Sequence, residues 1–192
     1  MLLNHTSEFT ALTEAQYAAV GKAVVEWANI EYLLGVVLTR LLATPEFLGR
    51  TYTDSMSAAR LQDAIIEAVE IHRVRYGLRL VGEPLLNEIA KVNGEITSLR
   101  VTRNKIAHFC WCRSTDEELF GTNFAGGVTS PKKERRDSAV LSSTALAELH
   151  TKTFAIVEQL MSIVTRLPRI TEESLLTPPS SGQPSTVDHS KL

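Results

Sequence analysis

The chain has 192 residues, a length that fits one domain with a terminal extension. Apolar residues make up 44% and charged residues 22%, which is ordinary for a globular protein, and the formal net charge of -2 excludes a global positive field for nucleic acid. No apolar run reaches the roughly 18 residues of a membrane-spanning helix. The two cysteines predict no disulfide framework, and the start MLLNHTSEFT has no secretory pattern. We therefore expect a cytoplasmic location.

The first predicted helix runs from Thr13 to Ala43, after a lead-in formed by residues 1–12. Thr13 suits the cap position, and Gln16, three residues later, completes a capping box. Pro45 ends the helix. Apolar side chains recur every three or four positions and share one stripe, which contains Val20, Ala23, Trp27, Ile30, Leu34, Val37, Leu38 and Leu41.

Three more long helices are predicted from the same periodicity. They run from about Ser57 to Leu80, from Glu83 to the region of His108, and from about Ser142 to Leu167. Four amphipathic helices of this length predict an all-α fold, an antiparallel bundle of four to five helices over residues 13–167.

Two segments lack a helical period. Residues 109–140 contain several glycines and the run PKKERR, so we expect a long loop between the third and fourth long helices, with a short hairpin through HFCWC as an option. Residues 168–192 are rich in Ser, Thr and Pro and predict a disordered tail.

Two charged residues lie on otherwise apolar helix faces. Glu31 lies about 40° from Trp27 on the helical wheel, and Arg103 continues the stripe of the third helix. An unpaired buried charge is costly, and a guanidinium fits a carboxylate as a bidentate fork, so Glu31 is the expected partner of Arg103. Two interpretations follow: a structural bridge between helices, or an Arg103 that lines a cleft, is oriented by Glu31 and binds a phosphate.

His108 lies five residues after Arg103, at the end of the third helix. Five residues turn an ideal helix by about 140°, so the two side chains do not share a face. They converge only if the last turn unwinds or if two subunits share the site. A histidine at a helix end is commonly a cap or a partner of the helix dipole, but Arg103, Asn104 and His108 are three polar groups within six residues.

These residues resemble a known motif. RNKIAH, from Arg103 to His108, is similar to the R-x4-6-H motif of the HEPN family of helical-bundle proteins. The upstream EWANIEYLLGVVLTRLL also resembles the first helix of bacterial HEPN-like proteins, in which a Trp and a Glu recur four residues apart, as Trp27 and Glu31 do here. Many relatives carry Gly after the His, where this chain has Phe109.

The resemblance implies a metal-independent endoribonuclease, often a homodimer, acting as a toxin beside an antitoxin protein or as an antiviral effector. Carried over by position, Arg103 and His108 are catalytic and Asn104 assists. The chemistry is consistent with these roles, because RNA supplies its 2′-hydroxyl as nucleophile, histidine moves protons near neutral pH, and arginine holds a phosphate. The alternative is a non-catalytic HEPN-like module for binding or dimerisation.

Further basic residues give weaker signals. Lys132, Lys133, Arg135 and Arg136 either contact the RNA backbone or belong to a solvated loop. Arg100 either widens a phosphate site or lies on an exposed flank. The Cys110–Cys112 pair is too isolated for a zinc site, and no Gly-rich phosphate loop occurs, so the sequence predicts neither a metal nor a cofactor.

Overall fold

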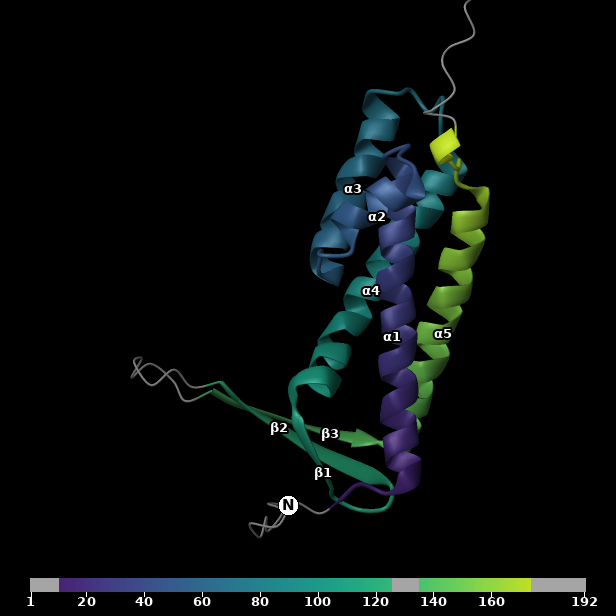
Figure 1. Ribbon diagram of the computed structural model, residues 1–192. Coiled ribbons are helices and arrows are strands. Elements are labelled where there is room, and N and C mark those ends of the chain that lie inside the picture. The colour runs from purple at the N-terminus through teal and green to yellow at the C-terminus, as the bar shows by residue number, and fades with distance from the viewer. Residues whose placement is uncertain (1–10, 126–134, 174–192) are drawn as a thin grey trace, which may run out of the picture.

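The computed structural model describes residues 11–125 and 135–173. Within these ranges five helices and three strands form a helical bundle with a small sheet at one end (Figure 1). In chain order the elements are α1 (Glu14–Leu41), α2 (Glu46–Thr53), α3 (Ala58–Val74), α4 (Glu83–His108), β1 (Cys110–Arg113), β2 (Glu118–Ala125), β3 (Arg135–Ser142) and α5 (Ser143–Arg166).

The start of α1 follows the predicted capping box. The backbone N–H of Gln16 donates to the Thr13 hydroxyl at 3.2 Å, and the Thr13 N–H donates to the Gln16 amide oxygen at 3.0 Å. These two bonds satisfy N–H groups that have no partner inside the helix. The helix ends at Leu41, two residues earlier than predicted, and Ala43 takes a left-handed backbone conformation with φ 50°.

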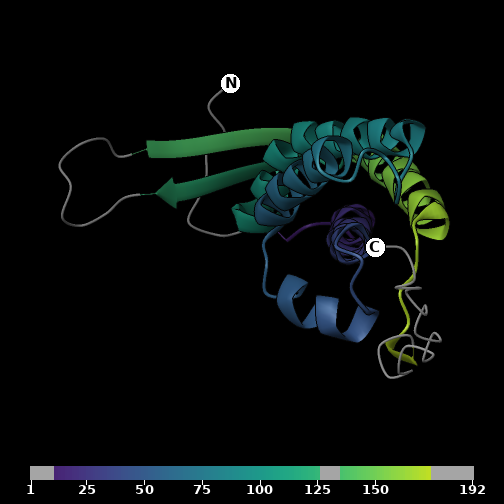
Figure 2. The ribbon, with the colours of Figure 1, turned by 90° about the horizontal axis from the view of Figure 1, so that it is seen from above.

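The short helix α2 was not predicted. It crosses in front of the upper part of α1 (Figures 1 and 2). Small residues allow this close contact, because a Cβ at Gly49 would overlap Thr39 and a Cβ at Gly35 would overlap the guanidinium of Arg50. A helix of eight residues with few apolar positions gives little periodicity, so its signal in the sequence is weak.

The predicted end of the second long helix was wrong, because α3 ends at Val74 rather than at Leu80. Gly77 and Leu78 have φ values of 53° and 63°, so the chain turns there through the left-handed region. Tyr76, within the predicted bounds of this helix, consequently lies outside it and is 46% exposed. His72 is buried, and its Nε2 donates to the carbonyl oxygen of Leu41 at 2.8 Å.

The bundle is not simply antiparallel, which corrects the predicted arrangement. Arg40, near the end of α1, donates to the carbonyl of Val164, near the end of α5, so these two helices run in the same direction. Among the long helices of the described residues, only α4 runs against the others, as its contacts from Glu83 to Arg73 of α3 and from Glu88 to Arg166 of α5 show. The cause is that α2 carries the chain part of the way back before α3 begins (Figure 1).

The predicted loop over residues 109–140 contains three antiparallel strands, which is the main correction to the fold, whereas the option of a short hairpin in this segment is confirmed by the pairing of β1 with β2. The strands have the order β1-β2-β3, with Trp111 opposite Gly121 and Leu119 opposite Leu141. Leu119 is fully buried beneath the bundle, and Trp111 and Leu141 pack around it. Gly121 leaves room for Trp111, because a Cβ there would lie 2.6 Å from the indole ring. Residues 126–134 lie outside the described residues.

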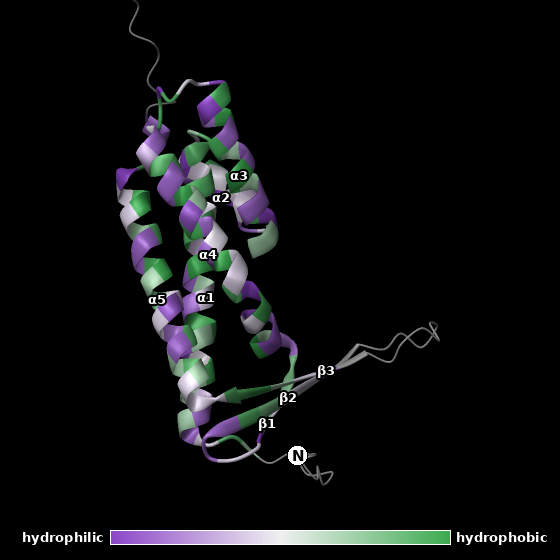
Figure 3. Ribbon diagram, turned by 180° about the vertical axis from the view of Figure 1, so that it is seen from behind, coloured by the Kyte–Doolittle hydropathy of each residue, from purple (hydrophilic) through white to green (hydrophobic). Residues whose placement is uncertain are grey.

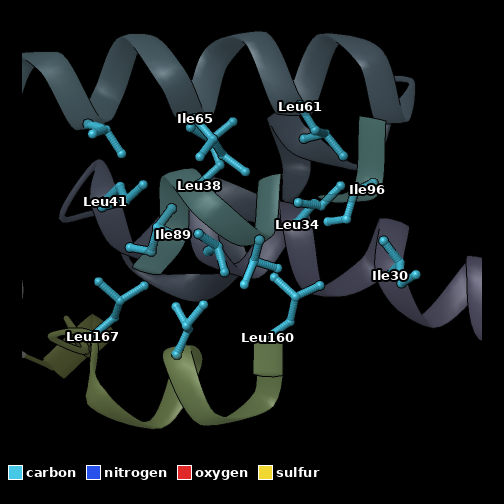
Figure 4. Packing of buried hydrophobic residues seen from close by; sticks show 14 of the residues in the cluster. Ile30, Leu34, Leu38, Leu41, Leu61, Ile65, Ile89, Ile96, Leu160 and Leu167 are labelled. Atoms are coloured by element: carbon cyan, nitrogen blue, oxygen red, sulfur yellow. The ribbon is translucent and has the colours of Figure 1, made fainter. Parts of the chain in front are cut away.

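The main core lies between α1, α3, α4 and α5. Figure 4 shows its side chains pointing toward one another, including Leu34, Ile65, Ile96 and Leu160. Seen from behind, hydrophilic and hydrophobic residues alternate along α5, as expected for a helix with one buried face (Figure 3). A second, smaller cluster joins the bundle to the sheet and consists of Ala23, Ile106, Leu119, Leu146 and Leu149.

Within the described residues, no helix is both long enough and apolar enough to cross a membrane. The predicted lead-in falls mostly in residues 1–10 and the predicted tail mostly in residues 174–192, and both ranges lie outside the described residues.

Candidate functional site

The residues around Arg103 come from α1 and α4. The buried indole of Trp27 donates from Nε1 to Glu31 Oε1 at 2.9 Å. The same carboxylate oxygen accepts from Arg103 Nη2 at 3.4 Å, and the guanidinium carbon lies 5.4 Å from the centre of the indole ring. Trp27 therefore orients the carboxylate that pairs with Arg103 and also offers its ring face to the cation.

Arg103 is held loosely and is only partly buried. Its side chain is 28% exposed, and that of Glu31 is 36% exposed. The second contact of the guanidinium, from Nη1 to Asn104 Oδ1, measures 3.3 Å. Hydrogen bonds from a cation to a carboxylate are usually about 2.7–2.9 Å long, and those from N–H to a neutral oxygen about 2.7–3.2 Å, so both contacts are long and weak. The guanidinium keeps N–H groups that are able to bind an anion.

His108 is the last residue of α4, and its ring is exposed. The helix stays regular to that point, because Phe109 N–H donates to the Lys105 carbonyl at 2.9 Å. The last turn therefore does not unwind, and within one chain His108 and Arg103 point about 140° apart. Among residues 11–125 and 135–173, no hydrogen bond or ion pair fixes the His108 side chain.

Arg100 is bound to α3 rather than to the residues around Arg103. Its Nη1 donates to Gln62 Oε1 at 3.2 Å. The Gln62 amide in turn donates to the carbonyl of Asn93 at 2.8 Å and to the hydroxyl of Thr97 at 2.9 Å. Arg100 is thus part of a polar network between α3 and α4, and it contributes positive charge near Arg103 without touching it.

A small hollow lies beside Arg103, between α1, α4 and α5. Its volume is about 40 Å³, and its lining includes Val24, Trp27, Ala107 and Thr153. A buried water needs about 10–15 Å³, so the hollow is small but has room for water. An anion reaches Arg103 from the surface, where its side chain is 28% exposed.

A larger open hollow, about 610 Å³, lies far from this site, between α2 and residues 169–173. Its lining mixes both signs of charge, with Arg169 3.5 Å from Glu46. It holds no histidine, and its size alone does not make it a site for the predicted chemistry.

The predicted basic run is divided by the structure. Lys132 and Lys133 lie outside the described residues. Arg135 and Arg136 begin β3 and pair with Ala125 and Phe124 of β2, so their backbone belongs to a strand rather than to the predicted loop. They lie at the end of the β2–β3 pair that is far from the junction with α5, and the two strands extend away from the bundle (Figure 2).

The role of Trp27 beside Arg103 was not predicted. Its spacing of four from Glu31 was visible, and residues four apart on a helix are neighbours. The contact with Arg103 was not visible, because it depends on how α1 packs against α4.

The two cysteines lie two residues apart in β1 and are free thiols. Burial, and to a lesser extent the neighbouring Cys110, raise the pKa of the Cys112 thiol. Within the part of the chain that the structure describes, no group of three or more His, Cys, Asp and Glu side chains is placed to hold a metal ion.

Comparison of the chain with protein-family models, with curated proteins and with solved structures gives no match.

Proposed function

We propose that the chain is a metal-independent endoribonuclease of HEPN-like type, with Arg103 and His108 as its catalytic residues and Asn104 in an assisting role. The observation that carries the proposal is the state of Arg103. Glu31 and Trp27 orient its guanidinium through contacts of 3.4 Å and 5.4 Å, yet the side chain remains 28% exposed. A cation that is oriented but not enclosed is suited to hold a phosphate.

The proposed reaction uses the 2′-hydroxyl of RNA. His108 takes its proton as the oxygen attacks the adjacent phosphorus. The bond from phosphorus to the 5′-oxygen breaks, and that oxygen takes up the proton that His108 removed from the 2′-hydroxyl. Arg103 stabilises the negative charge that builds on the phosphate oxygens, and Asn104 donates a further hydrogen bond. The products are a 2′,3′-cyclic phosphate and a 5′-hydroxyl.

The separation of the two side chains bears on the assembly of the site. Since α4 is regular through His108, one chain does not bring His108 beside its own Arg103. We therefore propose a homodimer in which the histidine of one copy works with the arginine of the other. Glu31 orients Arg103, and Arg100 adds positive charge from its place beside Gln62.

The basic residues Lys132, Lys133, Arg135 and Arg136 are proposed to contact the RNA backbone at a distance from the reacting phosphate. Such contacts would make binding weaken as salt rises. We propose a cytoplasmic role as a toxin, controlled by an antitoxin protein, or as an effector of antiviral defence.

A second candidate function is a non-catalytic binding module. It is favoured by the ion pair from Arg103 to Glu31, which already compensates the cation, and by the small size of the hollow beside it. In that case Arg103 and Asn104 bind a phosphate group without reaction.

The test uses total cellular RNA in EDTA. Wild-type protein is compared with the His108→Ala and Arg103→Ala variants. Arg60→Ala and His150→Ala are matched controls, because they remove the same side-chain types from other parts of the bundle. We expect cleavage by the wild type and both controls, loss of at least about 100-fold in the two site variants, and cyclic phosphate ends.

Circular dichroism first establishes that all variants are folded. Cleavage that survives in His108→Ala and Arg103→Ala, or that requires a divalent metal, would contradict the proposed mechanism. An intact RNA pool with measurable RNA binding that is lost in Arg103→Ala would favour the binding module.

A further inference from the structure

One face of α1 carries apolar and small residues that are largely exposed, and of the described residues only Arg50 is seen to lie over it, at the ring of Tyr32. We call it the α1 outer face. Its tyrosines and valines are between 49% and 57% exposed, its glycine and alanine are exposed too, and none of its members is charged. At 100° per residue they fall within an arc of about 100°. The members are Tyr17, Gly21, Val24, Val25, Ala28 and Tyr32.

The same face is covered further along the helix. Gly35 and Thr39 continue it, and there α2 packs so closely that a Cβ at Gly49 would overlap Thr39 and one at Gly35 would displace the end of the Arg50 side chain. Below α2 no other described helix or strand lies in front of α1 (Figure 1). Gly21 is the counterpart of Gly35 on the bare part, since a Cβ there would meet nothing within 4 Å. The bare part thus offers the kind of surface on which this fold already seats a helix.

The order of residues on the α1 outer face reads the same from both ends. Counting outward from the point between Val24 and Val25, Gly21 matches Ala28, and Tyr17 matches Tyr32. A two-fold axis at that point would place each tyrosine by a tyrosine and each small residue by a small residue. An interface with two-fold symmetry must be self-complementary, and this pattern is.

The charges at the two ends of the face are also complementary. Glu14 lies beyond Tyr17, in the first turn of α1, and is exposed. At the other end Arg50 lies over the ring of Tyr32 at 4.4 Å and against Gly35, where it also pairs with Asp54. The same two-fold brings residue 14 level with residue 35. Glu14 of each copy would therefore lie near Arg50 of the other, whereas a parallel pairing would place like charges together.

We propose that the α1 outer face binds the α1 outer face of a second copy of this chain, antiparallel, about a two-fold axis between Val24 and Val25. The open position at Gly21 lets the two helices approach closely. The tyrosines supply the largest apolar area, which is typical of the centre and anchors of protein interfaces. The pairs of Glu14 with Arg50 fix the direction.

This inference rests on the homodimer of the proposed function but uses none of its chemistry. An active dimer that Gly21→Arg leaves intact would count against this interface alone. The interface has a consequence for the proposed ribonuclease site. Val24 and Ala107 line the same small hollow, so His108 lies near the level of the two-fold axis. The axis would bring both copies of His108 to the same side of the helix pair.

The first test is the mass of the full chain in solution, measured by sedimentation equilibrium over a range of concentrations. We expect the wild type to have twice the mass of one chain. Gly21→Arg should raise the concentration needed for dimer formation by at least about ten-fold, because it places a large cation at the centre of the contact. Gly94→Arg is the matched control, since a Cβ at Gly94 of α4 also meets nothing within 4 Å.

A wild type of single-chain mass at all concentrations would overturn the proposal. So would a dimer that Gly21→Arg leaves intact, or one that Gly94→Arg disrupts equally. Because the readout is mass, a dimer without ribonuclease activity would count against the proposed function and not against this interface.

The second test measures direction. Spin labels are placed at Ala15→Cys or Lys22→Cys, two exposed positions on one side of α1, in chains where Cys110 and Cys112 are replaced by Ser. With a rise of about 1.5 Å per residue, the antiparallel pairing separates the two labels at 22 by about 8 Å along the axis and those at 15 by about 28 Å. Equal distances for the two positions would mean a parallel pairing and would overturn the proposed axis.

Discussion

The two ends of the bundle are held together by different means. At one end, here the closed end, α2 and α3 pack around the C-terminal half of α1, and most of the main core lies there. At the other, the sheet end, α3 is absent and a small cluster with Leu119 at its centre joins α1, α4 and α5 to the strands. Leu99 contacts both clusters and lies where they meet.

Arg103 lies one turn beyond Leu99, on the sheet-end side of that boundary. The difference between the ends explains why a cation is tolerated in the continuation of an apolar stripe. At the closed end α3 would bury such a cation. At the sheet end Arg103 stays partly exposed and needs only a loose ion pair with Glu31. The same absence of cover leaves the α1 outer face bare.

The largest expected effect is the loss of a core side chain at the closed end. Ile96→Ala should lower the free energy of unfolding by about 2–5 kcal/mol, because Ile96 is fully buried and its removal leaves a cavity. Urea denaturation followed by circular dichroism measures this. Val101→Ala, on the same helix but 64% exposed, should change stability by no more than about 0.5 kcal/mol. Equal losses in both would mean that the closed end is not the stabilising core.

The docking of α2 should be the next most sensitive feature. Gly49→Ala is expected to cost about 1–3 kcal/mol, because the new methyl group overlaps Thr39 and α2 must move away. Gly94→Ala is the matched control, because its Cβ meets nothing within 4 Å and alanine is the better helix former by up to about 1 kcal/mol. Thermal denaturation should therefore show Tm changes of opposite sign. A neutral Gly49→Ala would contradict the close contact of α1 and α2.

The link between α1 and the sheet depends on Gln16. Its side-chain amide donates to the carbonyls of Thr115 at 2.9 Å, Glu118 at 3.3 Å and Asp116 at 3.4 Å. Gln16→Met keeps the size but removes these donors and the capping box, for an expected loss of about 1–2 kcal/mol. Hydrogen exchange should become faster, relative to wild type, in β1 and β2 but not in α3. A uniform change across the chain would mean that the sheet end is not a separate unit.

The helices could be predicted because their signals are local. The stripe on α1, the Thr13 capping box and the proline near the start of α4 each depend on neighbours in sequence. The boundary of α3 was missed because Leu78 adopts a left-handed conformation that non-glycine residues rarely show. The direction of α5 beside α1 depends on α2 and the sheet, and neither element has a helical periodicity strong enough to predict it.

The candidate site could be predicted in part. The Trp27 and Glu31 spacing and the Arg103 to His108 spacing are visible in the sequence, and so is their different orientation on the helix. The loose contact of Arg103 with Glu31 and the network that holds Arg100 depend on packing between helices. The strands were predicted only as the option of a short hairpin, because the runs around Trp111 and Gly121 carry a weak alternating pattern. Their burial against α1 and α5 makes that pattern decisive.

A smaller effect is expected at the two thiols of β1. Burial, with a contribution from Cys110, raises the pKa of the Cys112 thiol, so less of the reactive thiolate is present near neutral pH. Cys112 is half-buried and Cys110 is exposed. Iodoacetamide followed by peptide mass spectrometry should therefore modify Cys110 faster, by about ten-fold. Equal rates would mean that the sheet end opens to solvent on the time scale of the reaction.

The smallest expected effect is at the surface of the closed end. Arg166 donates to Glu88 at 2.5 Å and lowers the pKa of that carboxyl, mainly through this hydrogen bond. A lowered pKa in the folded state contributes stability above the ordinary carboxyl pKa, and the contribution is lost as the pH falls through the lowered value. Both side chains are more than a third exposed, so Glu88→Gln should lower Tm at pH 7 by no more than about 2 °C. The difference from wild type should shrink toward pH 3. Glu95→Gln is the control, because its nearest cation, on Lys91, is 3.9 Å away. A difference that grows on acidification would mean that Glu88 is not stabilised as the carboxylate.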